Sequence, residues 1–317
     1  MAVETIAVVS TGSMGSALAR VWLEGGSRVV TTGAGRSERT HTLARAAGVE
    51  LLPTLEAAVA EADVVVSVAP PAEAAAIAHA VEDAARAAGT KPLFADLNAV
   101  SPRTMRSLEL TRLDLVDGAI SGPPPQRAGT TTLYLSGLRA QELADVPAPG
   151  LDVVVVGGAV GLASAVKMST ASVYKGMVAL LAHALLAARE NGVLEHVLAD
   201  LGPAYTDNVE RALARAGSKA PRYVGEMREI AATQADAGLT PELFEAMAEV
   251  YAALARSPLA DRELEELGSP DLETVLAALS EGGAGRAAGA ATRPGQSADP
   301  DGGPRPRGRL FGRARGG

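Results

Sequence analysis

The sequence contains no cysteine, and this absence excludes several kinds of chemistry at once. Disulfide bonds, thiolate zinc sites, iron–sulfur clusters and a cysteine nucleophile are all ruled out. Aromatic residues make up only 3% of the chain, whereas 47% is hydrophobic, so the core must be built from Ala, Val and Leu. Because the four histidines lack HxxxH or HxH spacing, we expect no metal site; they are His41, His79, His183 and His196.

Two further absences concern location and partners. Residues 1–9 lack the basic leading segment of a secretory signal, and no uncharged apolar run is long enough to cross a bilayer. We therefore expect a cytoplasmic protein without a membrane partner. The net charge is −8; residues 282–317 carry +5 from seven Arg and two Asp, which leaves −13 for the remainder. A body this acidic argues against nucleic acid as a partner.

Short β-branched runs alternate with Ala-rich helical segments from Thr5 to Val156. This alternation predicts an α/β domain over residues 1–160, with a doubly wound, Rossmann-type parallel sheet buried on both faces. From Gly161 the pattern changes to one long helix that ends near Asn191. The expected strands are TIAVV, RVVTT, DVVVSV, PLFADL, LDLVDGAI, TLYLSG and LDVVVV.

The long helix opens a second domain, all helical, over residues 161–281. Further helices are expected near 193–200, 205–216, 222–237, 240–256 and 270–280. The segment MVALLAHALLAA has no charge across its length, and a helix that is apolar all round must be covered on every side. We therefore expect a homodimer through the helical domain. From residue 282 the composition shifts to Gly, Ala, Pro and Arg, which predicts a disordered tail over 282–317.

The stretch STGSMGS, residues 10–16, lies between an expected strand and an expected helix. Gly12 and Gly15 occupy the second and third glycine positions of G-x-G-x-x-G, while Ser10 stands at the first. The two glycines permit close approach of a pyrophosphate and helix–strand packing, and the turn tolerates Ser10 if its φ is negative. The context predicts a dinucleotide site, with a plain turn as the alternative. The predicted cofactor-binding residues of this loop are Ser10, Thr11, Gly12, Ser13, Met14 and Gly15.

The end of the second expected strand indicates which cofactor is bound. It reads VVTTGAGRSERT, with no carboxylate before Glu38. NAD-binding proteins usually place Asp or Glu there for the ribose 2′-hydroxyl, whereas an arginine and a hydroxyl suit a 2′-phosphate. Arg36 and Ser37 therefore predict NADP in preference to NAD, and an ordinary solvated basic loop is the alternative.

Four further segments, in order and near spacing, resemble the β-hydroxyacid dehydrogenases, a superfamily that includes the 3-hydroxyisobutyrate and 6-phosphogluconate dehydrogenases. They are SVAPP (67–71), DLNAVSP (96–102), DGAISGPPPQRAGT (117–130) and GGAVGLASAVKMS (157–169). The loop TGSMG resembles the G-x-G-x-M-G of the same superfamily. The resemblance covers about residues 4–255. Within the superfamily, the chain resembles a bacterial branch labelled phosphogluconate dehydrogenase-like, whose C-terminal domain has no assigned function.

The resemblance implies a role for each matching position. Lys167 matches the catalytic lysine that opens the long helix. A lysine early in an apolar helix is also expected to face the cleft between the domains, where desolvation lowers its pKa toward neutrality. A lysine whose end extends into water is the alternative. The positions implied to bind cofactor are Ala69, Pro70 and Asn98, and those implied to bind substrate are Ser121, Gly122 and Pro123, which replaces a second glycine.

Two positions depart from the family pattern. Ala171 stands where the family has Asn, and Gly225-Glu226-Met227 stands where it has K-D-L. Lys175, two turns along the helix from Lys167 and about 80° around it, is expected to compensate partly as a substrate-binding residue. Glu226 reads most simply as a carboxylate on a helix surface; alternatively it faces the substrate and favours a cationic or imine-like one.

These observations predict an NADPH-dependent oxidoreductase that transfers hydride between the nicotinamide and a small hydroxy or carbonyl substrate. Lys167 is the expected general acid and base. Two alternatives stay open, namely an imine reductase on the same scaffold and a non-catalytic NADP-binding protein. The loss of the family's Asn and second Lys permits the latter.

Overall fold

The computed structural model describes residues 3–126, 128–262, 266 and 268–284. The described residues belong to one compact unit. The predicted disorder of residues 285–317 lies outside the described residues. Residues 282–284, which we assigned to the tail, belong instead to a π-helical turn, η2 (Ser280–Ala284), where the carbonyl of Gly282 accepts a hydrogen bond from Arg256 at 3.1 Å.

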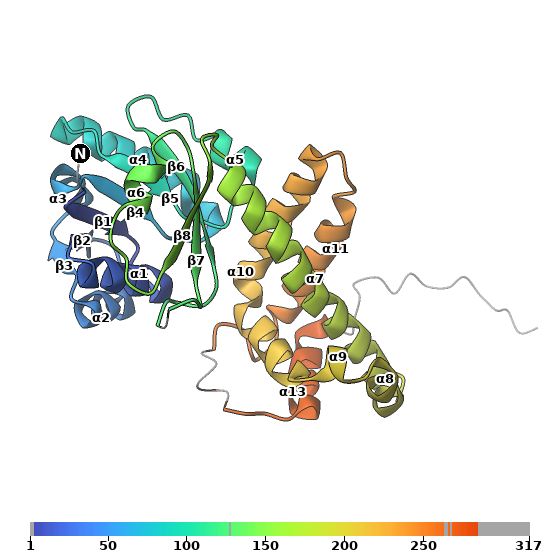
Figure 1. The fold of residues 1–317 in the computed structure, drawn as a ribbon. Coiled ribbons are helices and arrows are strands. Elements are labelled where there is room, and N and C mark those ends of the chain that lie inside the picture. Colours follow the sequence, from blue (N-terminus) through green and yellow to red (C-terminus); the bar gives the residue numbers. More distant parts are fainter. Residues whose placement is uncertain (1–2, 127, 263–265, 267, 285–317) are drawn as a thin grey trace, which may run out of the picture. The chain divides into compact units, whose positions relative to one another are not determined.

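The N-terminal part forms an eight-stranded sheet in the order β3-β2-β1-β4-β5-β6-β7-β8 (Figure 1). The first six strands are parallel, β7 is antiparallel to β6, and β8 is parallel to β7. Strand β7 departs from the predicted parallel arrangement, because residues 122–131 are too few for a crossover helix. The strands are β1 (Thr5–Val9), β2 (Arg28–Thr32), β3 (Glu50–Leu52), β4 (Val64–Ser67), β5 (Leu93–Asp96), β6 (Leu115–Ser121), β7 (Thr132–Ser136) and β8 (Asp152–Gly157).

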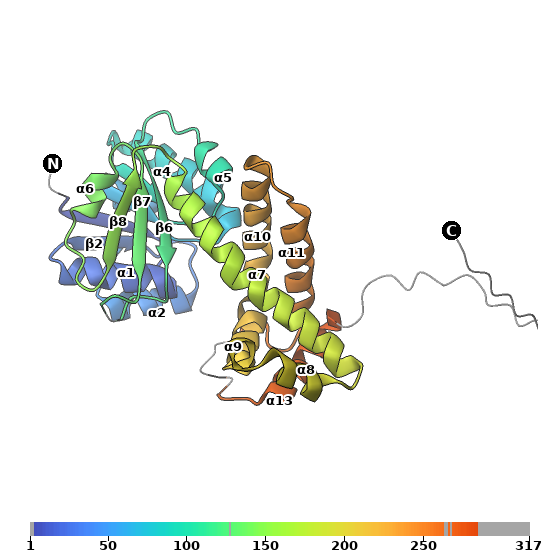
Figure 2. The same ribbon diagram turned by 45° about the vertical axis from the view of Figure 1, so that its right-hand side comes forward.

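Helices cover both faces of this sheet, which confirms the predicted Rossmann-type class (Figures 1 and 2). Alternate strand residues point to opposite faces: Ile6 and Val8 pack with α1, α2 and α6, whereas Ala7 and Val9 pack with α3, α4 and α5. The helical elements are α1 (Ser13–Glu24), α2 (Glu38–Ala47), α3 (Leu55–Glu61), η1 (Pro71–Glu73), α4 (Ala74–Ala88), α5 (Pro102–Arg106) and α6 (Ala140–Ala144).

After β8, the described chain is helical, and its helices bury a core of their own. The long helix α7 spans 29 residues, as its sequence predicts, and packs against α10 and α11. The elements are α7 (Leu162–Glu190), α8 (Leu194–Leu201), α9 (Pro203–Thr206), α10 (Val209–Asp236), α11 (Glu242–Leu254) and α13 (Leu272–Leu279). The boundaries of the two domains, 1–160 and 161–281, remain a prediction.

Helix α10 joins the two segments that we predicted as separate helices over 205–216 and 222–237. Pro221 lies inside it and has no N–H to donate to Gly217, four residues earlier. Tertiary packing outweighs this loss, because Gly217 lies so close to Leu259 and Leu279 that a Cβ would come within about 3.0 Å of both. Small residues around the proline therefore let the helix pass unbroken through the core.

One side of α7 carries large apolar side chains that remain exposed. Val173 is 62% exposed, Tyr174 74%, Met177 42% and Leu180 58%. Among the described helices, α7 is also the one long and apolar enough to cross a membrane. That is weak evidence for a membrane, because helices in the core of a protein pass the same test and ten residues of α7 are buried.

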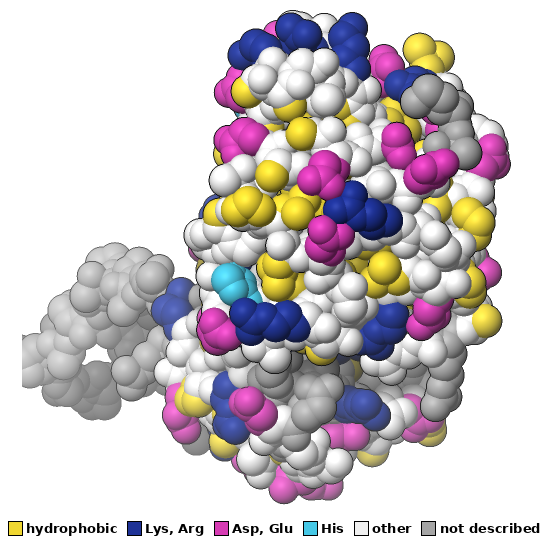
Figure 3. Space-filling view, turned by 90° about the vertical axis from the view of Figure 1, so that its left-hand side faces the viewer, with side chains coloured by type: hydrophobic (Ala, Val, Ile, Leu, Met, Phe, Trp, Pro, Cys, Tyr) yellow, Lys and Arg dark blue, Asp and Glu magenta, His cyan; other side chains and the backbone are white. Residues whose placement is uncertain are grey.

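The face of the sheet-bearing part that lies at the left of Figure 1 carries charges of both signs. Figure 3 shows Lys and Arg interspersed with Asp and Glu over most of this face, with hydrophobic side chains between them. The surface here is therefore of mixed charge.

Candidate active site

The carboxyl ends of β1 and β4 lie side by side where the strand order reverses. The chain passes from β1 to β2 on one side, while β4 is the other neighbour of β1. The N–H of Val68, after β4, donates to the carbonyl of Val9 at 3.2 Å, so the segment after β4 lies beside the glycine loop after β1. Open α/β sheets bind their ligands at such a point.

The glycine loop has the shape of an anion-binding turn. A Cβ on Gly12 would meet no atom within 4 Å, and the first turn of α1 contains no acidic residue. A Cβ on Gly15 would lie 2.3 Å from the carbonyl oxygen of Ser10, so helix–strand packing requires that glycine. The N–H groups and positive end of a helix favour phosphate. The loop therefore fits a dinucleotide pyrophosphate.

Ser10 adopts a φ of 74°, in the left-handed region. The condition that we set for Ser10, a negative φ, is not met, because the turn keeps the backbone conformation that glycine adopts without strain. Thr11 is buried, and Met14 packs against the core of the sheet, so both side chains support the loop from inside. Ser13 is exposed at the start of α1.

Arg36 and Ser37 follow β2 at the same edge of the sheet. The N–H of Arg36 donates to the carbonyl of Gly33 at 3.1 Å, and His41 Nε2 bonds to that carbonyl at 2.8 Å, which braces the turn. The hydroxyl of Ser37 caps α2 by accepting from the N–H of Thr40 at 3.3 Å. The two residues thus lie in the turn and cap that follow β2, and their contact with a 2′-phosphate remains a prediction.

Asn98 lies among buried groups rather than facing outward. Its Oδ1 accepts a hydrogen bond from the N–H of Ala69, and its Nδ2 donates to Ser67 Oγ and to Asp96 Oδ2, both at 3.0 Å. The amide is thus committed to holding the segment that follows β4, in which Pro70 is exposed. The cofactor contact implied for Asn98 remains a prediction.

Lys167 lies near the start of α7, and its Nζ donates to the carbonyl of Ile120 at 2.7 Å. Ile120 directly precedes Ser121, so the structure brings the lysine to the predicted substrate segment. Burial lowers the pKa of Lys167, and the positive charge of Arg222 lowers it further. The amino group is therefore held inside the protein rather than extended into water.

The start of α7 is fixed to the sheet by Asp117, a fully buried residue of β6. Its carboxylate accepts four hydrogen bonds, from Ser136 Oγ (2.8 Å), the N–H of Gly161 (2.9 Å), the N–H of Ser164 (3.1 Å) and Ser164 Oγ (2.6 Å). A carboxylate at a helix N-terminus stabilises the helix. Asp117 thereby sets where Lys167 lies relative to β6.

The predicted substrate segment, residues 121–123, turns sharply after β6. Gly122 has a φ of 125°, and a Cβ there would lie 2.3 Å from the carbonyl oxygen of Thr130, so only glycine fits. The carbonyl of Pro123 accepts a hydrogen bond from Thr131 Oγ1 at 2.6 Å. Ser121 is partly exposed at the end of the strand, next to the carbonyl that binds Lys167.

Glu226 is buried, with 2% of its surface exposed, so our interpretation of it as a surface carboxylate was wrong. It forms one ion pair with Lys175 of α7 and a second with Arg222, whose Nε lies 2.9 Å from a carboxylate oxygen of Glu226. The ammonium group of Lys175 also lies 4.3 Å from the ring centre of Tyr223. The alternative of an uncommitted carboxylate facing a cationic substrate does not fit these contacts.

Lys175 is electrostatically linked to the predicted catalytic lysine. Burial lowers its pKa well below the ordinary value, and the charges of Lys167, Arg222 and Arg215 add to this shift. Sequence reasoning missed Arg222 and Tyr223 in this cluster. For Arg222, the sequence did offer a sign of the contact: Arg222 and Glu226 are four residues apart, and the same helix buries Met227 and Ile230 beside them.

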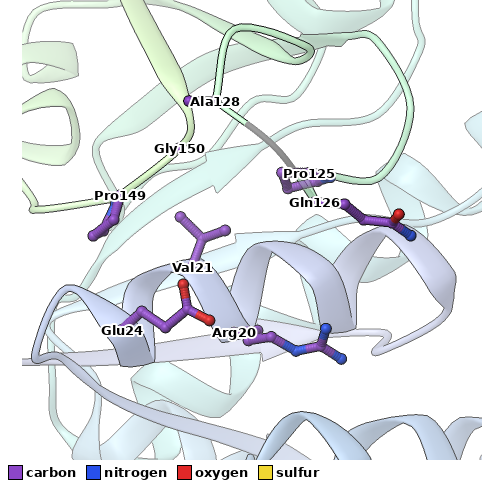
Figure 4. Close-up of a pocket in the computed structure, with 8 residues that line it drawn as sticks. All are labelled: Arg20, Val21, Glu24, Pro125, Gln126, Ala128, Pro149 and Gly150. Carbon is purple, nitrogen blue, oxygen red and sulfur yellow. The ribbon is translucent and has the colours of Figure 1, made fainter.

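Two described cavities lie away from these groups. Figure 4 shows a cavity of about 170 Å³ between α1 and the loops around residues 125–128 and 149–150; it contains none of the predicted site residues. A second, of about 670 Å³, is lined by residues around α5 and the start of β6. Among the described residues, no group of His, Asp and Glu could hold a metal ion. The candidate site is therefore located by the ends of the strands and by the contacts of its side chains, and not by a cavity or a metal.

The sheet with its glycine loop, followed by a helical part that returns a lysine to the carboxyl edge, defines a two-part Rossmann-type protein of the dehydrogenase fold. Family models match both parts: one described as NADP oxidoreductase coenzyme F420-dependent over residues 5–89, and a domain of unknown function, DUF1932, over residues 188–254.

Known proteins show the same relationship. An uncharacterised 28.5 kDa protein of Methanothermus fervidus is 30% identical over 169 residues, which are 52% of this chain and 63% of that protein. The conserved protein MTH1747, of unknown function and structurally similar to 3-hydroxyacid dehydrogenases, is 28% identical with a TM-score of 0.60, over 79% of this chain and 96% of that one. The 3-hydroxyisobutyrate dehydrogenase of Mycobacterium tuberculosis shares the fold, with 21% identity and a TM-score of 0.63 over 88% of this chain and 99% of that one.

The chain is therefore similar in fold to the 3-hydroxyacid dehydrogenases, and residues 188–254 match the model of the DUF1932 domain.

Proposed function

We propose that this chain is an NADPH-dependent oxidoreductase in which Lys167 is the general acid and base. The observation that carries the proposal is the hydrogen bond from Lys167 Nζ to the carbonyl of Ile120, which holds a partly buried amine beside Ser121. The glycine loop and the description of the family matched by residues 5–89 support a nicotinamide cofactor. Arg36 and Ser37 support NADP over NAD.

The nicotinamide, when bound, donates or accepts hydride. As the substrate carbonyl is reduced, the ammonium group of Lys167 donates a proton to the carbonyl oxygen; in the reverse direction the neutral amine takes that proton back. The carbonyl of Ile120 can accept a hydrogen bond from either form, so the amino group stays in place throughout. Because burial lowers the pKa of Lys167, both forms become accessible closer to neutral pH.

The charges beside Lys167 favour C=O over C=N chemistry. Lys167, Lys175 and Arg222 are cations, and Glu226, the carboxylate among them, is already paired with two of these residues. A protonated imine would be repelled by this surplus of positive charge. We therefore propose a small hydroxy or carbonyl compound as the substrate.

The test compares Lys167→Met with Lys91→Met, the same change at an exposed position before β5. We expect Lys167→Met to lower kcat by about 10²–10⁴ while the Kd for NADPH stays nearly unchanged. The Lys91 variant should match the wild type. In the direction of reduction, the wild-type rate should fall at high pH as Lys167 loses its proton, and the Lys167 variant should lack this limb.

A panel of oxo acids, aldehydes and cyclic imines identifies the chemistry. Turnover confined to imines would refute the preference for C=O. Tight NADPH binding without turnover of any compound would favour a non-catalytic binding protein. Retention of wild-type turnover by Lys167→Met would show that the proton comes from another group.

A further inference from the structure

Asp96 is a buried carboxylate that the proposed mechanism does not use. It lies at the carboxyl end of β5 and is fully buried. Both of its oxygens bind one residue: Oδ1 accepts from the backbone N–H of Asn98 at 2.8 Å, and Oδ2 accepts from Asn98 Nδ2 at 3.0 Å. Asp96 thus fixes the position of Asn98 at two points.

Asn98 passes this constraint to the segment after β4. Its Nδ2 also donates to the Oγ of Ser67, which is the last residue of β4. Its Oδ1 accepts a hydrogen bond from the N–H of Ala69. That segment bonds to the end of β1 through Val68 and lies beside the glycine loop. A continuous row of hydrogen bonds therefore runs from Asp96 to the switch point of the sheet.

We propose that Asp96 is a positioning residue that, through Asn98, holds the backbone of residues 68–70 ready for the nicotinamide cofactor. The proposal rests on the function proposed above, since it concerns the same cofactor site.

The ionised carboxylate sets the direction of the Asn98 amide. A carboxylate only accepts hydrogen bonds, so it requires the NH₂ group of Asn98 to face it. The amide oxygen must then point the other way, to the N–H of Ala69. If Asp96 is neutral, one of its oxygens becomes a donor and the reversed amide becomes possible, with NH₂ facing the N–H of Ala69. Ionised Asp96 is therefore needed to keep an acceptor at Ala69.

Burial raises the pKa of Asp96 to about 7; the hydrogen bonds from Asn98 oppose this shift, and the carboxylate of Asp117 adds to it. Asp117 on β6 is the register partner of Asp96, while the partner on β4 is the uncharged Ser67. The amide direction is thus enforced above pH 7 and released below it. The free energy of unfolding changes with pH in the opposite sense. Because the pKa of Asp96 in the folded protein is raised above 3.8, the fold loses stability as the pH rises toward 7.

The experiment measures the Kd for NADPH by its fluorescence, from pH 6 to 8.5, for the wild type, Asp96→Asn and Asp63→Asn. Asp63 is the matched control: its Oδ2 also accepts two hydrogen bonds, from the N–H groups of Glu4 and Thr5, but at the amino edge of the sheet. Titration of the cofactor's own phosphate cancels in the ratio of the variant Kd to the wild-type Kd.

For Asp96→Asn, we expect this ratio to rise from near one at pH 6 to about ten at pH 8.5. A tenfold change in Kd is roughly what the loss of one hydrogen bond to a charged group produces. For Asp63→Asn, the ratio should stay near one at every pH. A ratio that is constant with pH for Asp96→Asn would overturn the proposal.

If Asp96→Asn does not fold, Asn98→Ser takes its place, because serine is too short to join Asp96 to Ala69. A Kd for NADPH equal to that of the wild type at every pH would again overturn the proposal. A wild type that binds neither NADPH nor NADH would instead refute the proposed function.

Discussion

Replacing Glu226 by Gln removes a buried negative charge from between two cations while keeping the shape of the side chain. The side chain of Lys175 is 15% exposed and that of Glu226 is 3% exposed, so water cannot replace the lost partner at Lys175. Arg222 is 56% exposed on its side chain and can turn into solvent, so its contribution is at most about 1 kcal/mol.

The magnitude follows from what remains around Lys175. Breaking a buried pair by removing one partner typically costs about 3–5 kcal/mol. The ring of Tyr223, 4.3 Å from the ammonium group, still attracts the cation, which places the expected loss for Glu226→Gln near the lower end, about 3 kcal/mol at pH 7.

The loss should also depend on pH. The pKa of Lys175 is lowered by burial and by neighbouring cations. Removal of the Glu226 carboxylate, an opposite charge beside the amine, should lower it further. Between this folded pKa and the unfolded one, the unfolded chain binds more protons, so stability rises with pH by at most about 1.4 kcal/mol per unit. The deficit of Glu226→Gln should therefore shrink as the pH increases and Lys175 becomes neutral.

Urea denaturation followed by circular dichroism, at pH 7, 8 and 9 and one fixed protein concentration, measures these losses. Glu249→Gln is the control, because its pair with Arg228 is exposed at both ends; it should cost less than about 0.5 kcal/mol. Lys175→Met in combination with Glu226→Gln should recover most of the loss, since neither a buried cation nor its partner remains. A loss below 1 kcal/mol for Glu226→Gln, unchanged from pH 7 to 9, would refute this account of the pair.

Three further predictions concern the cofactor, the glycine loop and assembly. Arg36→Ala should raise the Kd for NADPH, but not for NADH, by the equivalent of about 1.5–3 kcal/mol, the value of a hydrogen bond to a charged group; equal affinity of the wild type for both cofactors would contradict the assignment of NADP. Ser10→Gly should raise the free energy of unfolding by about 0.5–1 kcal/mol, because it relieves the positive φ at some cost in chain entropy; a decrease on urea denaturation would mean that the hydroxyl is needed. We propose a homodimer through the exposed side of α7, so light scattering should give twice the chain mass of 32.1 kDa, and Leu180→Glu should give a single chain mass; a wild-type particle of one chain mass would exclude this dimer at the concentration used.

The sheet and the long helix were predictable because their patterns extend over many residues. The run DVVVSV contains β4, which buries each of its four residues, and α7 keeps its helical pattern over its whole length. The missed strand β3 has only three residues, at the edge of the sheet. The continuity of α10 was also missed, since Pro221 ends a helix by local rules and only contacts from distant residues keep it intact.

The candidate site was predictable where a residue type has a single physical use. Gly15 and Gly122 occupy positions that admit no side chain, and sequence motifs record such requirements. Burial of a charge leaves no comparable mark, because Glu226 is one of several carboxylates on an amphipathic helix. Its partner Lys175 is distant in sequence, so the pair becomes visible only when α7 and α10 are packed together.

The hydrogen bonds of Asp117 have a consequence for how the chain folds during synthesis. One of its partners, Ser136, lies in the sheet, but the other partners, Gly161 and Ser164, belong to the start of α7. In a nascent chain that ends before residue 161, the hydroxyl of Ser136 is the one of these partners that is present. Removing water from the carboxylate of Asp117 is then unfavourable, because its other hydrogen bonds cannot form. The last strands should therefore stay hydrated around Asp117 until the first turn of α7 leaves the ribosome and docks. A fragment cut at residue 160 would carry the same defect permanently, so the two parts of the chain are not separable without loss to the first.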